Sequence, residues 1–367
     1  MVVFGGKSTE HDISVITGVL SLNALKVTGE EVLPLYITKE GRWLTAAWMN
    51  DVTAFQKEKN AEEVVLLPAS DVLYIRKKNR LKPFGYVRAA LCALHGKNGE
   101  DGSFAAWMKA SRIPVASPDM TESAILMDKW YAKSCFSTCN IPVLPALSVL
   151  KEEFSENNEQ AVANVERSFP YPLCVKPARL GSSIGISIVH DSEELARALV
   201  LVFRYDFRAV IEPALTGFSE YSVAVYQKEG AILSGNARKE SVRGEILSFS
   251  DKYLSGGYTE GKTEEVADET ISRKVEDLAR SVYREMRLCG AVRFDFLEKD
   301  GEVYLNEANT VPGSLSYYFF ADSPKEAGPY LRDLIAEGKA RFREDESLKT
   351  DYISAALSGI DGKKYEK

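Results

Sequence analysis

Apolar and polar positions follow two different periods in the first hundred residues. Short apolar runs with the length and residue types of buried strands occur at 2–4, 32–37 and 89–94. Between the first two runs, apolar residues over 14–25 recur at helical spacing. Strands that alternate with a helix are typical of a parallel sheet covered by helices, so we expect an N-terminal α/β domain over 1–118.

The pattern breaks at 113–118, where two prolines interrupt it. A helix is predicted to begin there, with Asp119 as its N-terminal cap and Glu122 completing a capping box. Short strands around a glycine-rich loop then continue to about residue 205, and strands and a long helix follow. We therefore expect a small central domain over 119–205 and a C-terminal domain with a polar tail over 206–367.

Two amphipathic helices are predicted within these domains. The first begins after Asp191, with Glu194 at its third position, and the second ends at Gly290. Their apolar faces consist of Leu195, Ala198, Leu199 and Val202 in the first helix, and of Val275, Leu278, Ala279, Val282 and Met286 in the second.

A strand hairpin after the second helix carries polar side chains at alternate positions. Arg293 and Asp295 share one face of the first strand, and Glu307 and Asn309 share one face of the second. A loop of odd length would set Asp295 opposite Glu307, whereas a two-residue loop would put them on different faces. If they converge, two carboxylates and an amide oxygen suit Mg²⁺. The alternative is a solvated sheet face.

A glycine-rich loop follows an apolar strand that contains Lys176. The loop, 181–185, is kept small by glycine and serine, so its backbone N–H groups can converge on phosphate oxygens while the lysine adds a point charge. It is neither a Walker A loop nor a G-x-G-x-x-G fingerprint, and taken alone it is equally consistent with a tight turn between two strands.

Polar patches also occur at 5–11, 95–102 and 252–253. The first two follow apparent strand ends, which is where ligands usually bind in open α/β sheets. They contain His11 and His95, but a lone histidine is more often a hydrogen-bonded structural residue than a catalyst. We therefore predict no histidine base.

Composition narrows the class of protein. A chain of 367 residues exceeds what one hydrophobic core usually supports, and its net charge of −7 includes no basic block, so neither a nucleic acid nor an anionic membrane is expected as a partner. The sequence contains no apolar window of spanning length and does not begin with a signal-like segment, so we expect a cytoplasmic protein. Its five cysteines form no C-x-x-C pair and are expected to be reduced, structural thiols.

Taken together and in this order, the polar patches resemble the D-alanine–D-alanine ligases of the ATP-grasp superfamily. The resemblance covers nearly the whole chain and implies three α/β domains, with ATP held between the central and C-terminal ones. It implies an ADP-forming ligase that joins D-alanine to an amine acceptor through an acyl phosphate, for peptidoglycan precursor synthesis. It rests on residues 5–14, 95–102, Met127-Asp128-Lys129, 176–185, Lys252-Tyr253, Arg293-x-Asp295 and Glu307-x-Asn309-Thr310-x-Pro312-Gly313.

The resemblance also implies roles for individual residues. ATP would be bound by Lys129, Lys176, Ser183, Glu212, Leu215, Glu220 and Lys252. Two Mg²⁺ ions, or Mn²⁺ in their place, would be bound by Asp295, Glu307 and Asn309. The catalytic set would be Glu10, Ser182, Tyr253, Arg293 and the backbone N–H of Gly313, with His95, Ser316 and Tyr318 near the substrates. A homodimer is also suggested by the family.

One position departs from the family pattern. The family has a serine that binds the acceptor's carboxylate where this sequence has Tyr318, and Ser316 is an alternative donor. The acceptor is therefore open between D-alanine and another amine such as D-serine, although Tyr253 favours an amine over a hydroxy acid. The segment 212–220 is also one residue longer than usual, which makes the role of Glu220 less secure.

Two other classes of protein are less consistent with the sequence than a ligase. A nucleotide-binding protein without turnover is disfavoured by the intact set of lysine, arginine, carboxylate and amide side chains. A dehydrogenase is disfavoured because the first strand leads to Gly5-Gly6 with no G-x-G-x-x-G sequence and no matching acidic residue.

Overall fold

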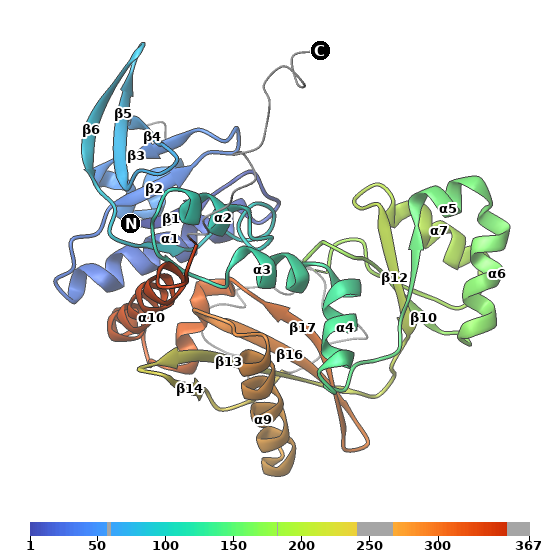
Figure 1. Cartoon of the computed structure of the whole chain (residues 1–367). Helices are drawn as coiled ribbons and strands as arrows, with labels where there is room; N and C mark the ends of the chain where they lie inside the picture. Colours follow the sequence, from blue (N-terminus) through green and yellow to red (C-terminus); the bar gives the residue numbers. More distant parts are fainter. Residues whose placement is uncertain (57–59, 182, 241–266, 351–367) are drawn as a thin grey trace, which may run out of the picture.

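The computed structural model describes residues 1–56, 60–181, 183–240 and 267–350. These residues form three sheets of eight, four and five strands, each with its own hydrophobic core. The five-stranded sheet borders the eight-stranded one, and the four-stranded sheet with its helices lies to one side (Figure 1). The mixed α/β content, with one partly parallel and two antiparallel sheets, confirms the predicted α/β class.

The N-terminal sheet begins with the parallel strands that the apolar runs predicted. Its parallel half has the order β2-β1-β7-β8, and α1 packs against β1. The elements of this half are β1 (Val2–Gly5), α1 (His11–Val27), β2 (Pro34–Ile37), β7 (Ala90–Cys92), α2 (Ser103–Ala110) and β8 (Val115–Ala116).

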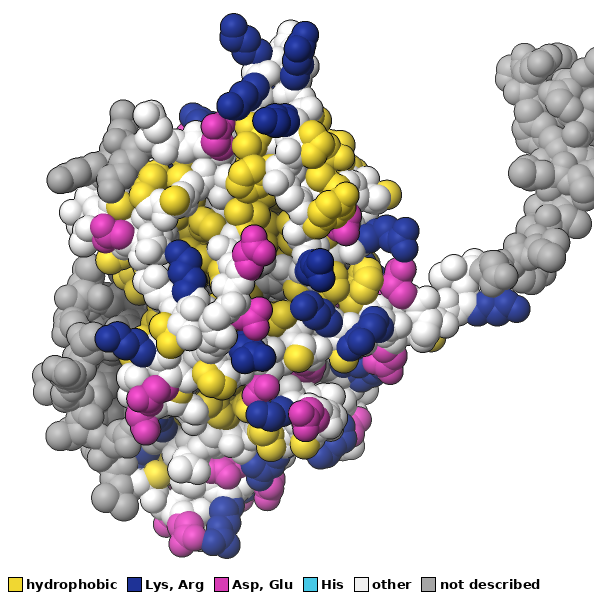
Figure 2. Space-filling view, turned by 90° about the vertical axis from the view of Figure 1, so that its left-hand side faces the viewer, with side chains coloured by type: hydrophobic (Ala, Val, Ile, Leu, Met, Phe, Trp, Pro, Cys, Tyr) yellow, Lys and Arg dark blue, Asp and Glu magenta, His cyan; other side chains and the backbone are white. Residues whose placement is uncertain are grey.

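The other half of this sheet is antiparallel and was not indicated by the sequence. Its strands continue from β2 in the order β3-β4-β5-β6, and the edge strand β6 is largely exposed, so no apolar alternation marks it. Figure 2 shows this face, where basic side chains gather at the tip of the hairpin beyond a strip of hydrophobic ones. The elements are β3 (Trp43–Thr45), η1 (Ala47–Asn50), η2 (Val52–Gln56), β4 (Glu62–Leu66), β5 (Val72–Lys77) and β6 (Arg80–Tyr86).

Helix α1 approaches β1 closely at Gly18. A Cβ added to Gly18 would overlap the Phe4 side chain, which is fully buried in the core. We therefore expect Gly18→Ala to lower the free energy of unfolding by about 1–3 kcal/mol, because the core must shift to admit the methyl group. Urea unfolding measures this loss. Gly85→Ala is the control, since no atom lies within 4 Å of its added Cβ; an equal loss in both variants would contradict the prediction.

The central sheet is antiparallel, in the order β11-β10-β12-β9. Asp191 caps α7 as predicted, accepting a hydrogen bond of 2.8 Å from the Glu194 N–H, and the four predicted apolar residues of α7 are buried. Strand β12 lies inside this sheet, between β10 and β9. The expected domain boundary at residue 205 would have placed β12 in the C-terminal domain instead. The elements are β9 (Leu147–Leu150), α5 (Lys151–Glu156), α6 (Asn158–Ser168), β10 (Leu173–Pro177), β11 (Ser187–Val189), α7 (Ser192–Val202) and β12 (Arg208–Pro213).

The C-terminal sheet has the order β14-β13-β16-β17, with β15 paired to β13, and α9 packs on it. The predicted apolar face of α9 is confirmed, since all five residues belong to or contact the core of this sheet. Helix α9 ends at Glu285, before Gly290, so the predicted end was too late. The elements are β13 (Ser219–Lys228), β14 (Ala231–Ser234), β15 (Arg238–Glu240), α9 (Glu269–Glu285), β16 (Val292–Lys299) and β17 (Glu302–Asn309).

The remaining helices connect the three cores. Helix α3 begins after Asp119 as predicted, but Asp119 accepts from the Met120 N–H at 2.7 Å and the structure shows no capping box with Glu122. Helices α3 and α4 contribute Leu126 and Phe136 to the core of the C-terminal sheet, and α10 packs against the N-terminal core. These elements are α3 (Met120–Met127), α4 (Lys129–Thr138), η3 (Gly313–Phe319), η4 (Pro324–Ala327) and α10 (Gly328–Glu346).

Two expectations from composition can be compared with the structure. All five cysteines are free thiols, as predicted. Among the described residues, no helix combines the length and the apolar character that crossing a membrane requires.

Candidate active site

A β-bulge decides which residues of the C-terminal hairpin face each other. The strands β16 and β17 are joined by the two-residue turn Asp300-Gly301, and this turn alone would set Asp295 opposite Asn306. The register shifts between Asp295 and Phe296, so Asn306 is the extra residue and Asp295 lies opposite Glu307. The alternative that the sequence left open is thus settled by the bulge, and an odd loop is not needed.

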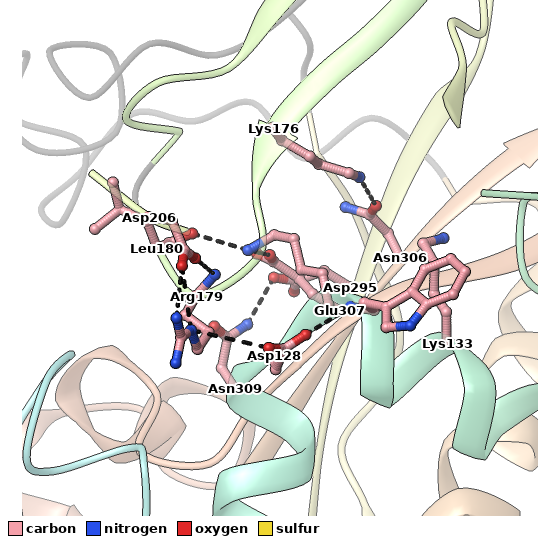
Figure 3. A network of polar contacts seen from close by, with 12 residues as sticks. Asp128, Lys133, Lys176, Arg179, Leu180, Asp206, Asp295, Asn306, Glu307 and Asn309 are labelled. Carbon is pink, nitrogen blue, oxygen red and sulfur yellow. Dashed lines mark hydrogen bonds and ion pairs between the residues drawn. The ribbon is translucent and has the colours of Figure 1, made fainter. Parts of the chain in front are cut away.

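The polar side chains of the hairpin converge on one face (Figure 3). Arg293 donates to both oxygens of Asp295 at 2.8 Å, and the Asn309 amide donates to Asp295 Oδ2 at 2.9 Å. Two carboxylates and an amide suit Mg²⁺, which prefers hard oxygen ligands and usually completes its coordination with water and substrate phosphates. No group of three or more histidine, cysteine, aspartate or glutamate side chains in the described part of the chain forms a metal site by itself.

Lys129 connects this hairpin to the glycine-rich loop. It is the first residue of α4, and its backbone N–H donates to Ala178 O at 2.9 Å. Its Nζ donates to Leu180 O at 2.8 Å and lies 3.8 Å from Glu307 Oε2. Burial lowers the pKa of Lys129 despite the nearby Glu307. The lysine thus lies where the loop and the carboxylates meet.

Glu212 on β12 lies between two lysines. Lys176 Nζ is 2.7 Å from one carboxylate oxygen and Lys133 Nζ is 2.8 Å from the other. Burial alone would raise the pKa of Glu212, but the two ammonium groups hold it below its ordinary value. Lys133 was not among the residues predicted from the sequence. Its spacing of four residues after Lys129 on α4 could have indicated that the two lysines share a helix face.

A second ion pair fixes the start of the glycine-rich loop. The Arg179 guanidinium donates to Asp206 Oδ1 at 2.7 Å, and the Arg179 backbone N–H donates to Asp206 Oδ2 at 2.7 Å. Arg179 Nε also lies 3.9 Å from Asp128, whose side chain caps α4 (Figure 3). This network could not be predicted from the sequence, because its three residues come from separate segments.

Glu10 belongs to the first polar patch and faces the same loop. A Cβ added to Gly181 would lie 3.6 Å from a Glu10 carboxylate oxygen, so this N-terminal carboxylate borders the glycine-rich loop. In that loop Ser183 has a left-handed backbone, with φ of +58°. Three of the predicted site residues, Ser182, Lys252 and Tyr253, lie outside the described residues.

The two histidines of the polar patches are both buried and hydrogen-bonded within the protein. His11 bonds Gly6 O at 2.6 Å and Tyr36 Oη at 3.1 Å. His95 bonds Thr17 Oγ1 at 2.8 Å and Val311 O at 2.7 Å, so both ring nitrogens have protein partners. The contact between His95 and Val311 joins the N-terminal domain to the segment that follows Asn309.

The segment after Gly313 has an unusual backbone. The backbone is left-handed at three successive residues, with φ of +53° at Ser314, +50° at Leu315 and +53° at Ser316. Residues other than glycine rarely adopt this conformation, and it lowers stability unless surrounding contacts hold it. The Ser314 N–H donates to Thr17 Oγ1 at 3.1 Å, and Leu315 O accepts from Tyr330 Oη at 2.8 Å. The N-terminal domain and α10 therefore hold this turn in place.

The turn brings the two candidate acceptor residues into one short segment. The Ser316 side chain is fully buried, and its Oγ has no hydrogen-bond partner among the described residues. Tyr318 is half-buried, and the Arg238 guanidinium lies 5.4 Å from the centre of its ring. Of the remaining predicted nucleotide residues, Leu215 lies in the loop after β12, which ends at Pro213, and Glu220 lies on β13 opposite Glu240.

Comparison with known proteins assigns the chain to a family. The model of the N-terminal region of D-Ala–D-Ala ligases matches residues 1–118, and the model of their C-terminal region matches residues 135–337. The chain belongs to the D-alanine–D-alanine ligase family. The resemblance found in the sequence is thereby confirmed.

Relatives in this family align over nearly their whole length. A D-alanine–D-alanine ligase of Thermosipho melanesiensis is 30% identical, with 95% of this chain and 96% of the relative covered. One of Chloroherpeton thalassium is 33% identical, with 91% and 93% covered. Among solved structures, the VanG D-Ala:D-Ser ligase of Enterococcus faecalis has a TM-score of 0.74 at 26% identity, covering 93% of this chain and 98% of that one.

Proposed function

We propose that this chain is a D-alanine–D-alanine ligase that uses ATP to activate one D-alanine as an acyl phosphate and joins it to a second. The observation that carries the proposal is the convergence of Asp295, Glu307 and Asn309 on one sheet face beside Lys129. That face combines oxygen ligands for a divalent ion with a cation for phosphate. The product would serve peptidoglycan precursor synthesis in the cytoplasm.

Two Mg²⁺ ions, or Mn²⁺ in their place, are the metals that we propose for this face. The donor set fits, because Asp295 and Glu307 supply two carboxylates and Asn309 an amide oxygen. When bound, the ions would neutralise charge on the transferred phosphoryl group. Arg293 donates hydrogen bonds to both carboxylate oxygens of Asp295, so a metal ion would compete with Arg293 for these oxygens.

The lysines of the site are proposed to hold the nucleotide. Lys129 and Lys176 would bind the α- and β-phosphates and Lys252 the γ-phosphate. The burial of Lys129 and Lys176 supports this role, since a buried ammonium attracts an anion more strongly than an exposed one. The other contacts with the nucleotide are proposed for Ser183, Glu212, Leu215 and Glu220.

The remaining catalytic groups face the reacting carboxyl group in this proposal. Arg293 and the backbone N–H of Gly313 would stabilise the negative charge that develops on oxygen in both steps. Glu10 would bind the ammonium group of the first D-alanine, and its position beside Gly181 supports its contact with the glycine-rich loop. Ser182 and Tyr253 would join Glu10 in closing the site.

The second substrate is proposed to be D-alanine, bound near Ser316 and Tyr318. The unpartnered, buried Ser316 hydroxyl supports a donor role toward the acceptor's carboxylate, since a buried hydroxyl without a partner is costly. D-Serine is the alternative acceptor, because Tyr318 replaces the family's serine and a single pocket side chain shifts such a preference by only about 1–3 kcal/mol. A homodimer is proposed from the family alone.

Phosphate release from ATP and Mg²⁺ by the purified protein tests this function, with products identified by mass. We expect release with D-alanine alone, together with the dipeptide and ADP. Release only when D-serine or another amine is added would keep the ligase chemistry and change the acceptor. Nucleotide binding without turnover under any amino acid would replace the proposal with a binding protein.

A further inference from the structure

Lys133 is a buried residue of the proposed nucleotide site, and its ammonium group contacts Glu212 and a backbone carbonyl. The residue is 4% exposed, and its Nζ lies 2.8 Å from Glu212 Oε1 and 3.4 Å from Leu144 O. Glu212 is 2% exposed, and its other oxygen faces Lys176. The carboxylate is therefore shared between a lysine on α4 and a lysine on β10.

The two lysines differ in what else they can reach. Lys176 Nζ also lies 3.3 Å from Asn306 Oδ1, the bulge residue next to the metal-binding face, so its ammonium borders the proposed phosphate position. Lys133 contacts a backbone carbonyl of the segment that follows its own helix. A bound nucleotide would draw Lys176 toward phosphate and leave Lys133 in place.

If Lys176 turned toward a phosphate, the buried Glu212 carboxylate would lose one of its two cationic partners. A desolvated carboxylate that loses its cations is costly and takes up a proton instead. Within the described residues, the charged and titratable groups around this carboxylate are Lys133, Lys176, Lys129 and Cys174. Of these, only Lys133 and Lys176 form ion pairs with Glu212.

We propose that Lys133 is a positioning residue that keeps Glu212 ionised and oriented while the nucleotide engages Lys176. The inference rests on the proposed function, because it takes Lys176 to be a phosphate ligand. It adds a residue that touches neither phosphate nor metal, and it assigns the two lysines of one ion-pair cluster to different tasks.

The test is titration calorimetry of a non-hydrolysable ATP analogue with Mg²⁺, in buffers of different ionisation enthalpy, between pH 7 and 9. We expect Lys133→Met to weaken binding about tenfold to a hundredfold. We also expect it to take up more protons on binding than the wild type, because Glu212 would become protonated when Lys176 turns away. Binding linked to proton uptake weakens as pH rises, so the affinity of this variant should fall toward pH 9 more steeply than that of the wild type.

Two further variants separate positioning from folding. Lys133→Arg keeps a buried cation and should restore both the affinity and the wild-type proton count, whereas Lys133→Gln keeps a hydrogen-bond donor without charge and should behave like Lys133→Met. Wild-type affinity and proton count in Lys133→Met, or in Lys133→Gln should the methionine variant not fold, would overturn the inference. A wild-type protein that binds no nucleotide would overturn the proposed function, and this inference with it.

Discussion

Asp295→Asn is expected to lower the turnover of the ligase about a thousandfold while the protein stays folded. The substitution removes one of the two carboxylates on the metal-binding face, opposite Glu307. Charge stabilisation by a metal ion contributes several kcal/mol in such sites, and a thousandfold loss corresponds to about 4 kcal/mol. The asparagine would also offer Arg293 one acceptor oxygen where the carboxylate offers two.

Phosphate release with ATP and D-alanine measures this loss, at a low and a high concentration of Mg²⁺. Partial recovery at high Mg²⁺ is expected, because the defect lies in metal binding. Asp300→Asn is the matched control, since Asp300 lies in the exposed turn of the same hairpin and asparagine tolerates its φ of +53°. A variant at Asp295 that retains more than a tenth of wild-type turnover at low Mg²⁺ would refute the proposed metal site.

The stability of the protein is expected to fall by about 3 kcal/mol as the pH rises from about 4.5 to about 7, through one buried group. Glu337 on α10 is 9% exposed, and its carboxyl group accepts from the Gly290 N–H at 3.2 Å and from Tyr283 Oη at 3.3 Å. Burial raises the pKa of Glu337 from its ordinary value of 4.5 to about 7. Folding therefore favours the protonated form.

The sign of this dependence follows from the raised pKa. Below pH 4.5 the carboxyl group is protonated in both folded and unfolded chains, so the contribution to stability is fully present. Above pH 4.5 the unfolded chain loses its proton first, and the contribution has disappeared once the pH exceeds about 7.

Urea unfolding of the wild type and of Glu337→Gln at pH 5, 6, 7 and 8 checks this. The variant should lack the part of the slope that Glu337 contributes, because glutamine keeps the hydrogen bonds without titrating. Glu346→Gln is the control on the same helix, where the side chain is exposed and should leave the slope unchanged. Equal slopes for the wild type and Glu337→Gln would show that another group titrates.

Local features of this protein could be predicted from residues close together in the chain. Asp191 caps α7 because its side chain needs only an N–H three residues away, and the apolar faces of α7 and α9 follow from helical spacing. The parallel strands of the N-terminal sheet were visible as short buried runs. The order of the polar motifs was enough to indicate the family, and the family models that match the chain confirm it.

Features that depend on distant segments could not be predicted in the same way. The edge strand β6 is largely exposed and shows no apolar alternation. Helix α9 ends at Glu285, and the first residue after it with a left-handed backbone is Arg287 instead of Gly290. Neither Lys133 nor Arg179 was predicted from the sequence as a residue of the site. Their partners, Glu212 and Asp206, are supplied by other segments of the chain.

By itself, the sequence determined the residue types of the site and the family to which they belong. Only the tertiary structure decided which of these residues meet. The bulge at Asn306 sets Asp295 opposite Glu307, and the left-handed turn at Ser314 is held by Thr17 from the opposite end of the chain. The physical reason is that spacing fixes which face a side chain takes within one element, whereas register and packing between elements depend on the balance of all contacts in the folded chain.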